Sequence, residues 1–180
     1  LVRVNHEYLI VECQLIKNLK FDHEPTILTN FCGGKLNGLM YTNPLLQDNL
    51  SRPLLHGDHV TSTAGTGLVH TAPGHGADDY LVGVANNLEV YSPVDHEGRY
   101  ILNELPETLH HALTEPGTKS ARKVLSSETT HQILELLREF DMLLYSHEYV
   151  HSYPYDWRSK KPIIIRSTPQ WFADLSDTKG

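Results

Sequence analysis

The chain has little cysteine and no long apolar stretch. Its 180 residues include only two cysteines, Cys13 and Cys32, which lie far apart and outside any C-x-x-C pair. This pattern predicts neither a disulfide framework nor a cysteine-based zinc site, and it fits a reducing compartment. Because no apolar run approaches about 18 residues, no membrane-spanning helix is expected.

The chain is also short of positive charge. It carries 15 Lys and Arg against 22 Asp and Glu, which gives a formal net charge of -7. A surface that binds nucleic acid through many phosphates needs clustered basic side chains, so any contact with RNA is expected to be local. One basic cluster near the C-terminus could contact phosphates, although a solvated face is the commoner role of such residues. It consists of Arg158, Lys160, Lys161 and Arg166.

The first residues lack an initiator Met and a basic-then-apolar targeting signal. The stretch Leu1-Val2-Arg3-Val4 is more typical of a cut made inside a larger protein. A length of 180 residues suffices for one domain with its own hydrophobic core. We therefore expect a single domain over residues 1–180.

Short apolar and β-branched runs predict the strands. Two of the runs flank a tight turn at Ala64–Gly67, and another follows the turn-forming pair Asn37-Gly38. The last run, Pro162–Arg166, has the composition of a buried strand. We expect strands at residues 8–11, 39–41, 59–63, 68–71 and 162–166.

Two helices are predicted from spacing and capping signals. The first begins at Asp78 and Asp79 and ends at Asn86-Asn87. The second has the clearest periodicity and Ser126 or Ser127 as its N-cap. Its apolar positions are Ile133, Leu136, Leu137, Phe140 and Leu144. The region between the helices, Pro93–Lys119, is rich in Pro, Gly, His and Thr and is expected to form loops. This mixture predicts an α+β fold, a mixed β-barrel-like domain with a few peripheral helices.

Titratable side chains lie on both sides of one glycine-rich loop. His70 would end a strand before the loop, and Asp79 would lie in the first turn of the helix after it. A helix N-terminus favours an ionised carboxylate, which would suit an ammonium ligand. Asp79 could equally be a first-turn dipole partner and His70 a hydrogen-bonded core histidine. A metal site of His70, His75 and Asp79 is a weaker alternative, because their spacing matches no H-E-x-x-H motif.

The stretch Gly65–Tyr80, GTGLVHTAPGHGADDY, resembles the editing-site signature of isoleucyl-tRNA synthetases. The valyl and leucyl enzymes share its opening and its last aspartate but lack the His-Thr pair at positions 70 and 71. The segments 92–100 and 151–172 also resemble this family, so the likeness covers most of the chain.

The resemblance implies an editing domain of the connective peptide 1 type, inserted in a class I catalytic Rossmann domain. Residues 162–180 would return toward that domain. The implied reaction is hydrolysis of the ester that joins valine to isoleucine tRNA, with water as co-substrate. The editing domain would need no metal or other cofactor, whereas the parent enzyme uses ATP and Mg. The implied partners are the valine-carrying acceptor end of tRNA(Ile) and the rest of the synthetase in cis, with no membrane.

By the same resemblance, Asp79 would hold the α-ammonium group of the misattached amino acid. His70 would line the pocket that admits valine and excludes isoleucine. The remaining substrate-binding positions are Thr71, Gly74, His75 and Gly67. Backbone N–H groups of the glycine-rich loop are the expected donors to the oxyanion. His70 could take the proton from water, or the adjacent ribose hydroxyl of the substrate could organise the water instead.

The chain departs from the family in two places. The threonine-rich peptide that forms the opposite wall of the pocket would lie upstream of Leu1. Asp156 and Ser159 stand where many relatives have cysteines, which excludes a thiol role there. The His-Thr-Ala-Pro-Gly-His-Gly form resembles bacterial and organellar enzymes, so we expect the mitochondrial matrix, with the bacterial cytoplasm as the alternative. The alternative functions are a non-catalytic module that positions the tRNA acceptor end and a metal-dependent hydrolase.

Overall fold

The computed structural model describes residues 1–63 and 65–173, and the chain forms two compact units. The larger unit combines residues 1–71 with 93–154. The smaller unit combines residues 72–92 with the segment from 155 onward. The expected returning segment, residues 162–180, falls in the smaller unit, and its last seven residues, 174–180, lie outside the described part of the chain.

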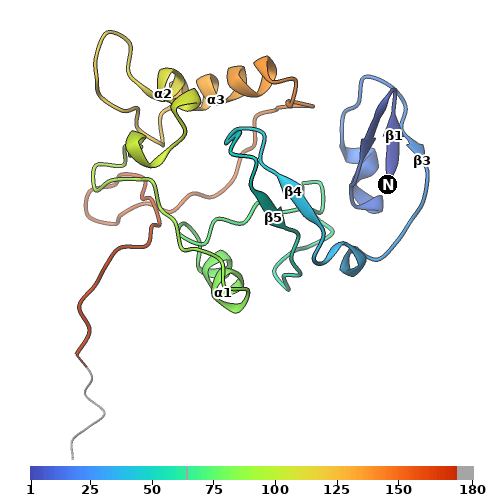
Figure 1. The fold of residues 1–180 in the computed structure, drawn as a ribbon, viewed down its shortest axis with the longest axis horizontal. Coiled ribbons are helices and arrows are strands. Elements are labelled where there is room, and N and C mark those ends of the chain that lie inside the picture. The colour runs from blue at the N-terminus through green and yellow to red at the C-terminus, as the bar shows by residue number, and fades with distance from the viewer. Residues whose placement is uncertain (64, 174–180) are drawn as a thin grey trace, which may run out of the picture. The chain divides into compact units, whose positions relative to one another are not determined.

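Two small antiparallel sheets belong to the larger unit (Figure 1). In the first, β1 (Val2–Val4) pairs with β2 (Glu7–Leu9) on one side and with β3 (Thr26–Ile27) on the other. Val2 and Val4 are buried, as their alternation along β1 requires of a sheet with one covered face. The second sheet pairs β4 (Met40–Thr42) with β5 (Ser51–Pro53). Three short 3-10 helices accompany the sheets and helices, at Cys13–Asn18, Gly33–Leu36 and Leu102–Glu104.

The predicted strands are confirmed only where a partner strand is close. The expected strands at 8–11 and 39–41 appear as β2 and β4, each shifted or shortened by one or two residues. Residues 59–63 and 68–71 form no strand, and 162–166 contributes only an isolated bridge between Tyr155 and Pro162. Those three predictions are wrong, because an apolar run becomes a strand only when another backbone completes its hydrogen bonds. Within the described residues the strands form two separate sheets, so the α+β class holds but no closed barrel is present.

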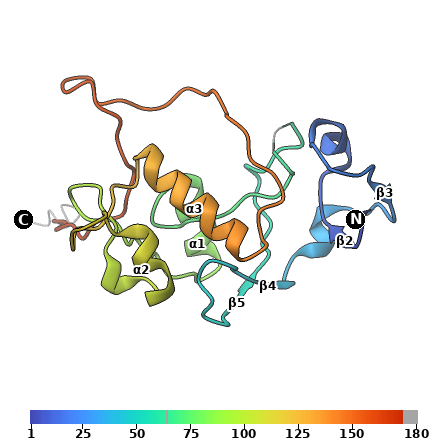
Figure 2. The same cartoon turned by 90° about the horizontal axis from the view of Figure 1, so that it is seen from above.

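The main hydrophobic core of the larger unit lies between two helices, α2 (Glu107–Leu113) and α3 (Ser127–Glu139), which are side by side in Figures 1 and 2. Its buried members are Leu109, Ala112, Leu113 and Leu136. Ile133 and Phe140 pack against them, which confirms the periodic helix and its core-facing stripe. The prediction for Leu144 is wrong, because α3 ends at Glu139 and Asp141 turns the chain with a φ of 54°.

The helix α2 lies inside the region that was expected to be loops. Its seven residues lie between Pro106 and Pro116 and include the pair His110-His111. The prolines and histidines predict a loop, and the apolar spacing of so short a helix is too brief to indicate otherwise. The apolar positions of α2 nevertheless follow the i, i+3, i+4 spacing that one helical face requires. Tertiary packing on α3 therefore stabilises a helix that is too short to be stable alone.

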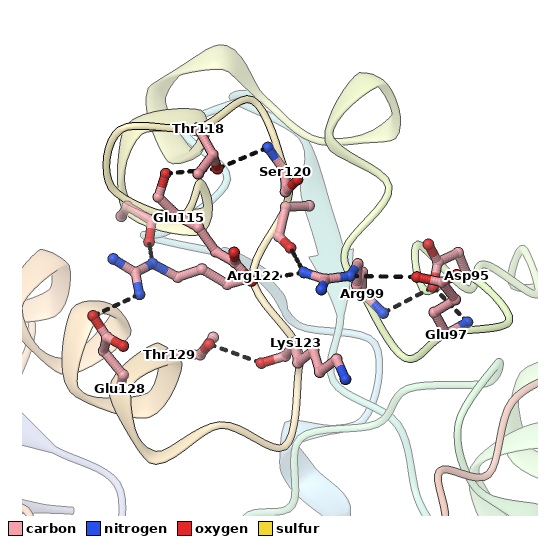
Figure 3. A network of polar contacts seen from close by, with 12 residues as sticks. Asp95, Glu97, Arg99, Glu115, Thr118, Ser120, Arg122, Lys123, Glu128 and Thr129 are labelled. Carbon is pink, nitrogen blue, oxygen red and sulfur yellow. Dashed lines mark hydrogen bonds and ion pairs between the residues drawn. The ribbon is translucent and has the colours of Figure 1, made fainter.

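Two arginines organise the polar network around this helix pair (Figure 3). Arg122 is 6% exposed; its Nε donates to the carbonyl oxygen of Ala112 at 2.9 Å, and its Nη1 pairs with Glu128 at 2.9 Å. Arg99 Nη1 donates to Glu115 at 2.7 Å and to the Ala121 carbonyl at 2.6 Å. The hydrogen bond from Arg99 lowers the pKa of Glu115. The network thus ties residues that follow α2 both to α2 itself and to the start of α3.

The smaller unit contains α1 (Ala77–Ala85). Asp78 and Asp79 lie in its first turn, and Asn86 is its C-cap, so this helix is confirmed at both ends. Gly83 is buried, and a Cβ there would lie 2.8 Å from the side chain of Pro73. This glycine therefore allows the helix to pack closely on the loop that precedes it. None of the helices in the described residues is long and apolar enough to cross a membrane.

Candidate functional site

The glycine-rich opening of the motif is a left-handed turn in the larger unit. Gly65 and Gly67 have φ values of 66° and 81°, a conformation that favours glycine. The Glu12 N–H donates to the Thr66 carbonyl oxygen at 2.7 Å, and a Cβ on Gly67 would collide with Glu12. The turn at this position is confirmed for the described residues 65–67. Glu12, which holds it, lies more than fifty residues earlier, and no sequence pattern linked the two.

His70 and Thr71 follow this turn in the larger unit. His70 is exposed, and no hydrogen bond of its ring is found among the described residues. Thr71 is half-buried. Neither residue lies in a strand, so the prediction that His70 ends one is wrong. An exposed imidazole in open coil is accessible to a ligand, which removes the alternative of a hydrogen-bonded core histidine.

The smaller unit holds the rest of the motif as a tightly packed loop, Ala72–Gly76. The His75 N–H donates to the Ala72 carbonyl at 2.8 Å, which closes a turn. The Gly74 carbonyl accepts the Ser167 N–H at 2.8 Å. Gly74 is buried, and a Cβ there would collide with the carbonyl oxygen of Tyr91. Two segments that follow α1 in the chain, at Tyr91 and at Ser167, therefore hold this loop in place.

His75 is anchored by one ring nitrogen. Its Nδ1 lies 2.9 Å from the carbonyl oxygen of Ile165. A carbonyl oxygen can only accept a hydrogen bond, so Nδ1 must carry the proton. In the neutral imidazole Nε2 then has a lone pair and acts as an acceptor. The ring is thus held in one tautomer with a basic nitrogen at its far end.

Asp79 stabilises the same loop from the helix side. Its Oδ2 accepts the Ala72 N–H at 3.1 Å, and its carboxylate lies against Gly76, the N-cap of α1. No hydrogen bond to Oδ1 is found among the described residues. Asp79 therefore combines a structural contact through one oxygen with a second oxygen that can accept from a ligand.

The six predicted site residues are divided between the two units. Gly67, His70 and Thr71 belong to the larger unit, and Gly74, His75 and Asp79 to the smaller one. The structure brings the second group together around the loop Ala72–Gly76. A pocket that uses all six residues stays a prediction.

Two further features of the smaller unit were missed by sequence reasoning. The segment Ile165–Ser167 supplies the main-chain partners of His75 and Gly74, about ninety residues away in the chain. Ser92 has a buried Oγ without a hydrogen-bond partner among the described residues, and its Cβ lies 3.1 Å from the position that a Cβ on Gly74 would take. Any residue type can make main-chain contacts of this kind, so the sequence does not predict them. Both segments nevertheless resemble the synthetase family.

The metal-dependent alternative would need His70, His75 and Asp79 around one ion. In residues 1–63 and 65–173, no group of three or more His, Cys, Asp and Glu side chains is arranged to hold a metal ion. Nδ1 of His75 is already bound to a carbonyl oxygen, and Oδ2 of Asp79 to a backbone N–H.

Comparison with known proteins gives relatives over nearly the whole chain, although no family model matches it. The mitochondrial isoleucine--tRNA ligase of Saccharomyces cerevisiae is 56% identical over 182 aligned positions, covering 100% of this chain and 18% of that protein. The isoleucine--tRNA ligase of Acholeplasma laidlawii is 45% identical, covering 93% of this chain and 17% of the relative. That of Crocosphaera subtropica is 40% identical, covering 95% and 17%.

The chain thus spans less than a fifth of the length of these relatives. The similarity nevertheless runs through both compact units and includes the loop around His75 and Asp79. Identity of 40 to 56% along nearly the full chain places it in the isoleucine--tRNA ligase family, in which it matches one segment of a much longer protein.

Proposed function

We propose that this segment performs post-transfer editing: it hydrolyses the ester that joins valine to the terminal ribose of isoleucine tRNA. The proposal rests on the position of the Asp79 carboxylate and on its hydrogen bonding. It is fixed in the first turn of α1 by the Ala72 N–H, and its second oxygen is available to an ammonium group. An aminoacyl ester carries a free α-ammonium group next to the scissile carbonyl, which gives this carboxylate a specific partner.

Substrate selection follows from the side chains that would surround the bound amino acid. His70 and Thr71 are proposed to limit the space beside the valine side chain, so that isoleucine, one methylene longer, is excluded. Gly67 and Gly74 allow the substrate to approach the backbone closely, because neither has a Cβ. Backbone N–H groups of the glycine-rich loop would donate to the oxyanion that forms as water attacks the ester.

Two histidines are candidates for the base that activates the water. His70 is the exposed candidate expected from sequence. His75 is supported by its anchored Nδ1, since the tautomer leaves Nε2 able to take a proton. The base would accept a proton from water as the hydroxyl oxygen bonds to the carbonyl carbon. It would return that proton to the ribose oxygen as the ester C–O bond breaks, which releases valine and tRNA.

The proposal requires no metal or other cofactor in this segment, and its partners are the acceptor end of tRNA(Ile) and the remainder of the synthetase. The parent protein would use ATP and Mg for its aminoacylation reaction. A mitochondrial location is proposed because the relative with 56% identity is named as mitochondrial, and a bacterial cytoplasm is the alternative because bacterial relatives reach 45%.

The test is release of labelled valine from mischarged isoleucine tRNA by the protein as its gene encodes it. Asp79→Asn removes the charge that would bind the ammonium group, and we expect a loss of about ten- to 160-fold in kcat/KM, as for a charged partner. Asp78→Asn is the matched control, because Asp78 is an exposed neighbour in the same helical turn. Correctly charged isoleucyl-tRNA should be stable with both.

Equal valine release by Asp79→Asn and Asp78→Asn would refute the role of Asp79. Binding of tRNA without any valine release by the wild-type protein would instead support the non-catalytic module that positions the acceptor end. Activity that is lost with a chelator and restored by a metal ion would support the metal-dependent alternative.

A further inference from the structure

Five aromatic rings alternate along one segment of the larger unit. The segment Tyr145–Tyr153 has a Tyr or His at every second position. The rings of Tyr145 and His147 stack with centroids 5.4 Å apart, and those of Tyr149 and His151 stack at 5.3 Å. The ring of Tyr153 meets that of His151 edge-on at 6.0 Å. Contacts between rings two positions apart bring these side chains to one edge of the chain, which we call the aromatic strip.

The strip is exposed although it is rich in large rings. Tyr149 is 69% exposed, and Tyr145 and Tyr153 are each 40% exposed. Among the described residues no ring contact joins His147 to Tyr149, so the stack is interrupted at its middle. Exposed aromatic rings in a row indicate a binding surface more often than isolated ones do.

One cation lies at the end of the strip, where it could contact a phosphate. The Lys20 ammonium group lies 5.8 Å from the centroid of the Tyr145 ring, which places a cation at one end of the strip. The segment contains one acid, Glu148, at a position between two of the rings. Phenol and imidazole groups also present polar tips that can donate to phosphates and base edges while the ring faces stack.

We propose that the aromatic strip is a stacking platform for single-stranded RNA. Bases would stack on the exposed ring faces and enter the interval between His147 and Tyr149. Alternate residues of an extended chain are about 6.6 Å apart, close to twice the thickness of an aromatic ring, so one base would fit between the rings of His147 and Tyr149, which do not stack on each other. Stacking suits a chain with a net charge of -7, because it needs few phosphate contacts.

The identity of the RNA rests on the proposed function, which supplies the unpaired 3′ end of a tRNA. A hydrophobic protein partner is the competing occupant of exposed rings. Such an interface is commonly enriched in Phe, Trp and Met as well as Tyr, whereas every ring of this strip carries a polar atom. The strip therefore fits a nucleic acid better.

The test measures the RNA affinity of the protein as its gene encodes it. The ligands are a fluorescein-labelled single-stranded oligoribonucleotide and isoleucine tRNA, the latter with and without its unpaired 3′ nucleotides. Tyr149→Ser should weaken binding of the oligoribonucleotide by about five- to a hundredfold, the range for loss of one stacked base. Tyr149→Phe keeps the ring and should bind within about threefold of wild type. Val150→Ser, at a position that is 96% exposed between two rings, is the control for substitution in the segment.

Three further readouts define the outcome. Binding should depend weakly on salt, with a slope of log K against log salt near -0.7, the value for about one phosphate contact on a single strand. A matching RNA duplex should bind more weakly, and removal of the unpaired nucleotides from the tRNA should abolish the effect of Tyr149→Ser. Equal affinity of Tyr149→Ser and wild type, or equal loss in Tyr149→Phe and Tyr149→Ser, would overturn the proposal.

A lower melting temperature of Tyr149→Ser with unchanged RNA affinity would assign the Tyr149 ring to the stability of the fold and would also overturn the proposal. Valine release measured on the same preparations separates this inference from the proposed function. Absence of release in the wild type would refute editing, whereas the strip is judged only by the difference in affinity between the variants.

Discussion

Replacing Arg122 by Met should loosen the contact between α2 and the chain that follows it. The guanidinium group of Arg122 caps the C-terminal end of α2, since its Nε donates to the carbonyl of Ala112, one of the last four carbonyls of that helix. Ala112 is 1% exposed, so water cannot easily replace the lost donor. Met has a stem of similar length and keeps the apolar packing, which isolates the effect of the polar head.

The magnitude follows from the two contacts that are lost. An unsatisfied buried carbonyl that had a charged donor destabilises by about 1.5–3 kcal/mol. The ion pair with Glu128 contributes at most about 1 kcal/mol, because the Glu128 side chain is 63% exposed. We therefore expect the free energy of unfolding to fall by about 1.5–4 kcal/mol, which for a chain of this size corresponds to roughly 3–16 °C in melting temperature.

Chemical denaturation and amide hydrogen exchange of α2 are the measurements. Glu128→Gln is the matched control: it removes the ion pair and leaves the hydrogen bond to Ala112, so it should destabilise by less than about 1 kcal/mol. Faster exchange in α2 should accompany Arg122→Met and not Glu128→Gln. Equal effects of the two substitutions would refute the reasoning, because the stabilisation would then come from the exposed ion pair.

Three other predictions concern the acid response, the packed loop and the anchored histidine. The hydrogen bond from Arg52 holds the pKa of Asp48 at about 2, below its usual 3.8. The stabilisation by the ionised Asp48 should therefore be complete above about pH 4 and be lost as the pH falls through about 2. The free energy of unfolding of Asp48→Asn, measured against pH, should not show this decrease. Gly74→Ala should destabilise by about 1–3 kcal/mol in thermal unfolding, because its Cβ collides with a backbone carbonyl, whereas Gly33→Ala has free space around it and should stay near wild type. His75→Asn keeps a donor near the position of Nδ1 and loses Nε2, so it should unfold like the wild type yet lower the kcat of valine release by about a hundredfold or more; a kcat equal to that of the wild type would limit His75 to a structural role.

The sequence predicted the parts of the fold that depend on local signals. The helix α3 was predicted from its apolar spacing, and α1 from acidic residues in its first turn and asparagines at its end. The turn at Gly65–Gly67 followed from glycine, since positive φ values are costly for other residues. Each of these features is determined by residues within the same turn or the same helix.

The predicted strands show where local signals fail. The run at 68–71 has strand-like composition but forms no strand, and the run at 162–166 forms only the isolated bridge of Pro162 with Tyr155. The short helix α2 is the opposite case. Its local sequence predicts no helix, but packing of its apolar face on α3 stabilises one. In both cases the deciding term is a contact with residues far away in the sequence.

The candidate site likewise has features that the sequence predicts and features that depend on the tertiary structure. The sequence by itself determined which residue types stand in the motif, its family resemblance and the position of Asp79 in a first helical turn. Only the tertiary structure decided that His75 is held by the carbonyl of Ile165 and the loop by Ser167, and that Gly67 lies against Glu12. The physical reason is that these anchors use main-chain groups, which every residue carries, so no choice of side chain in the sequence records them.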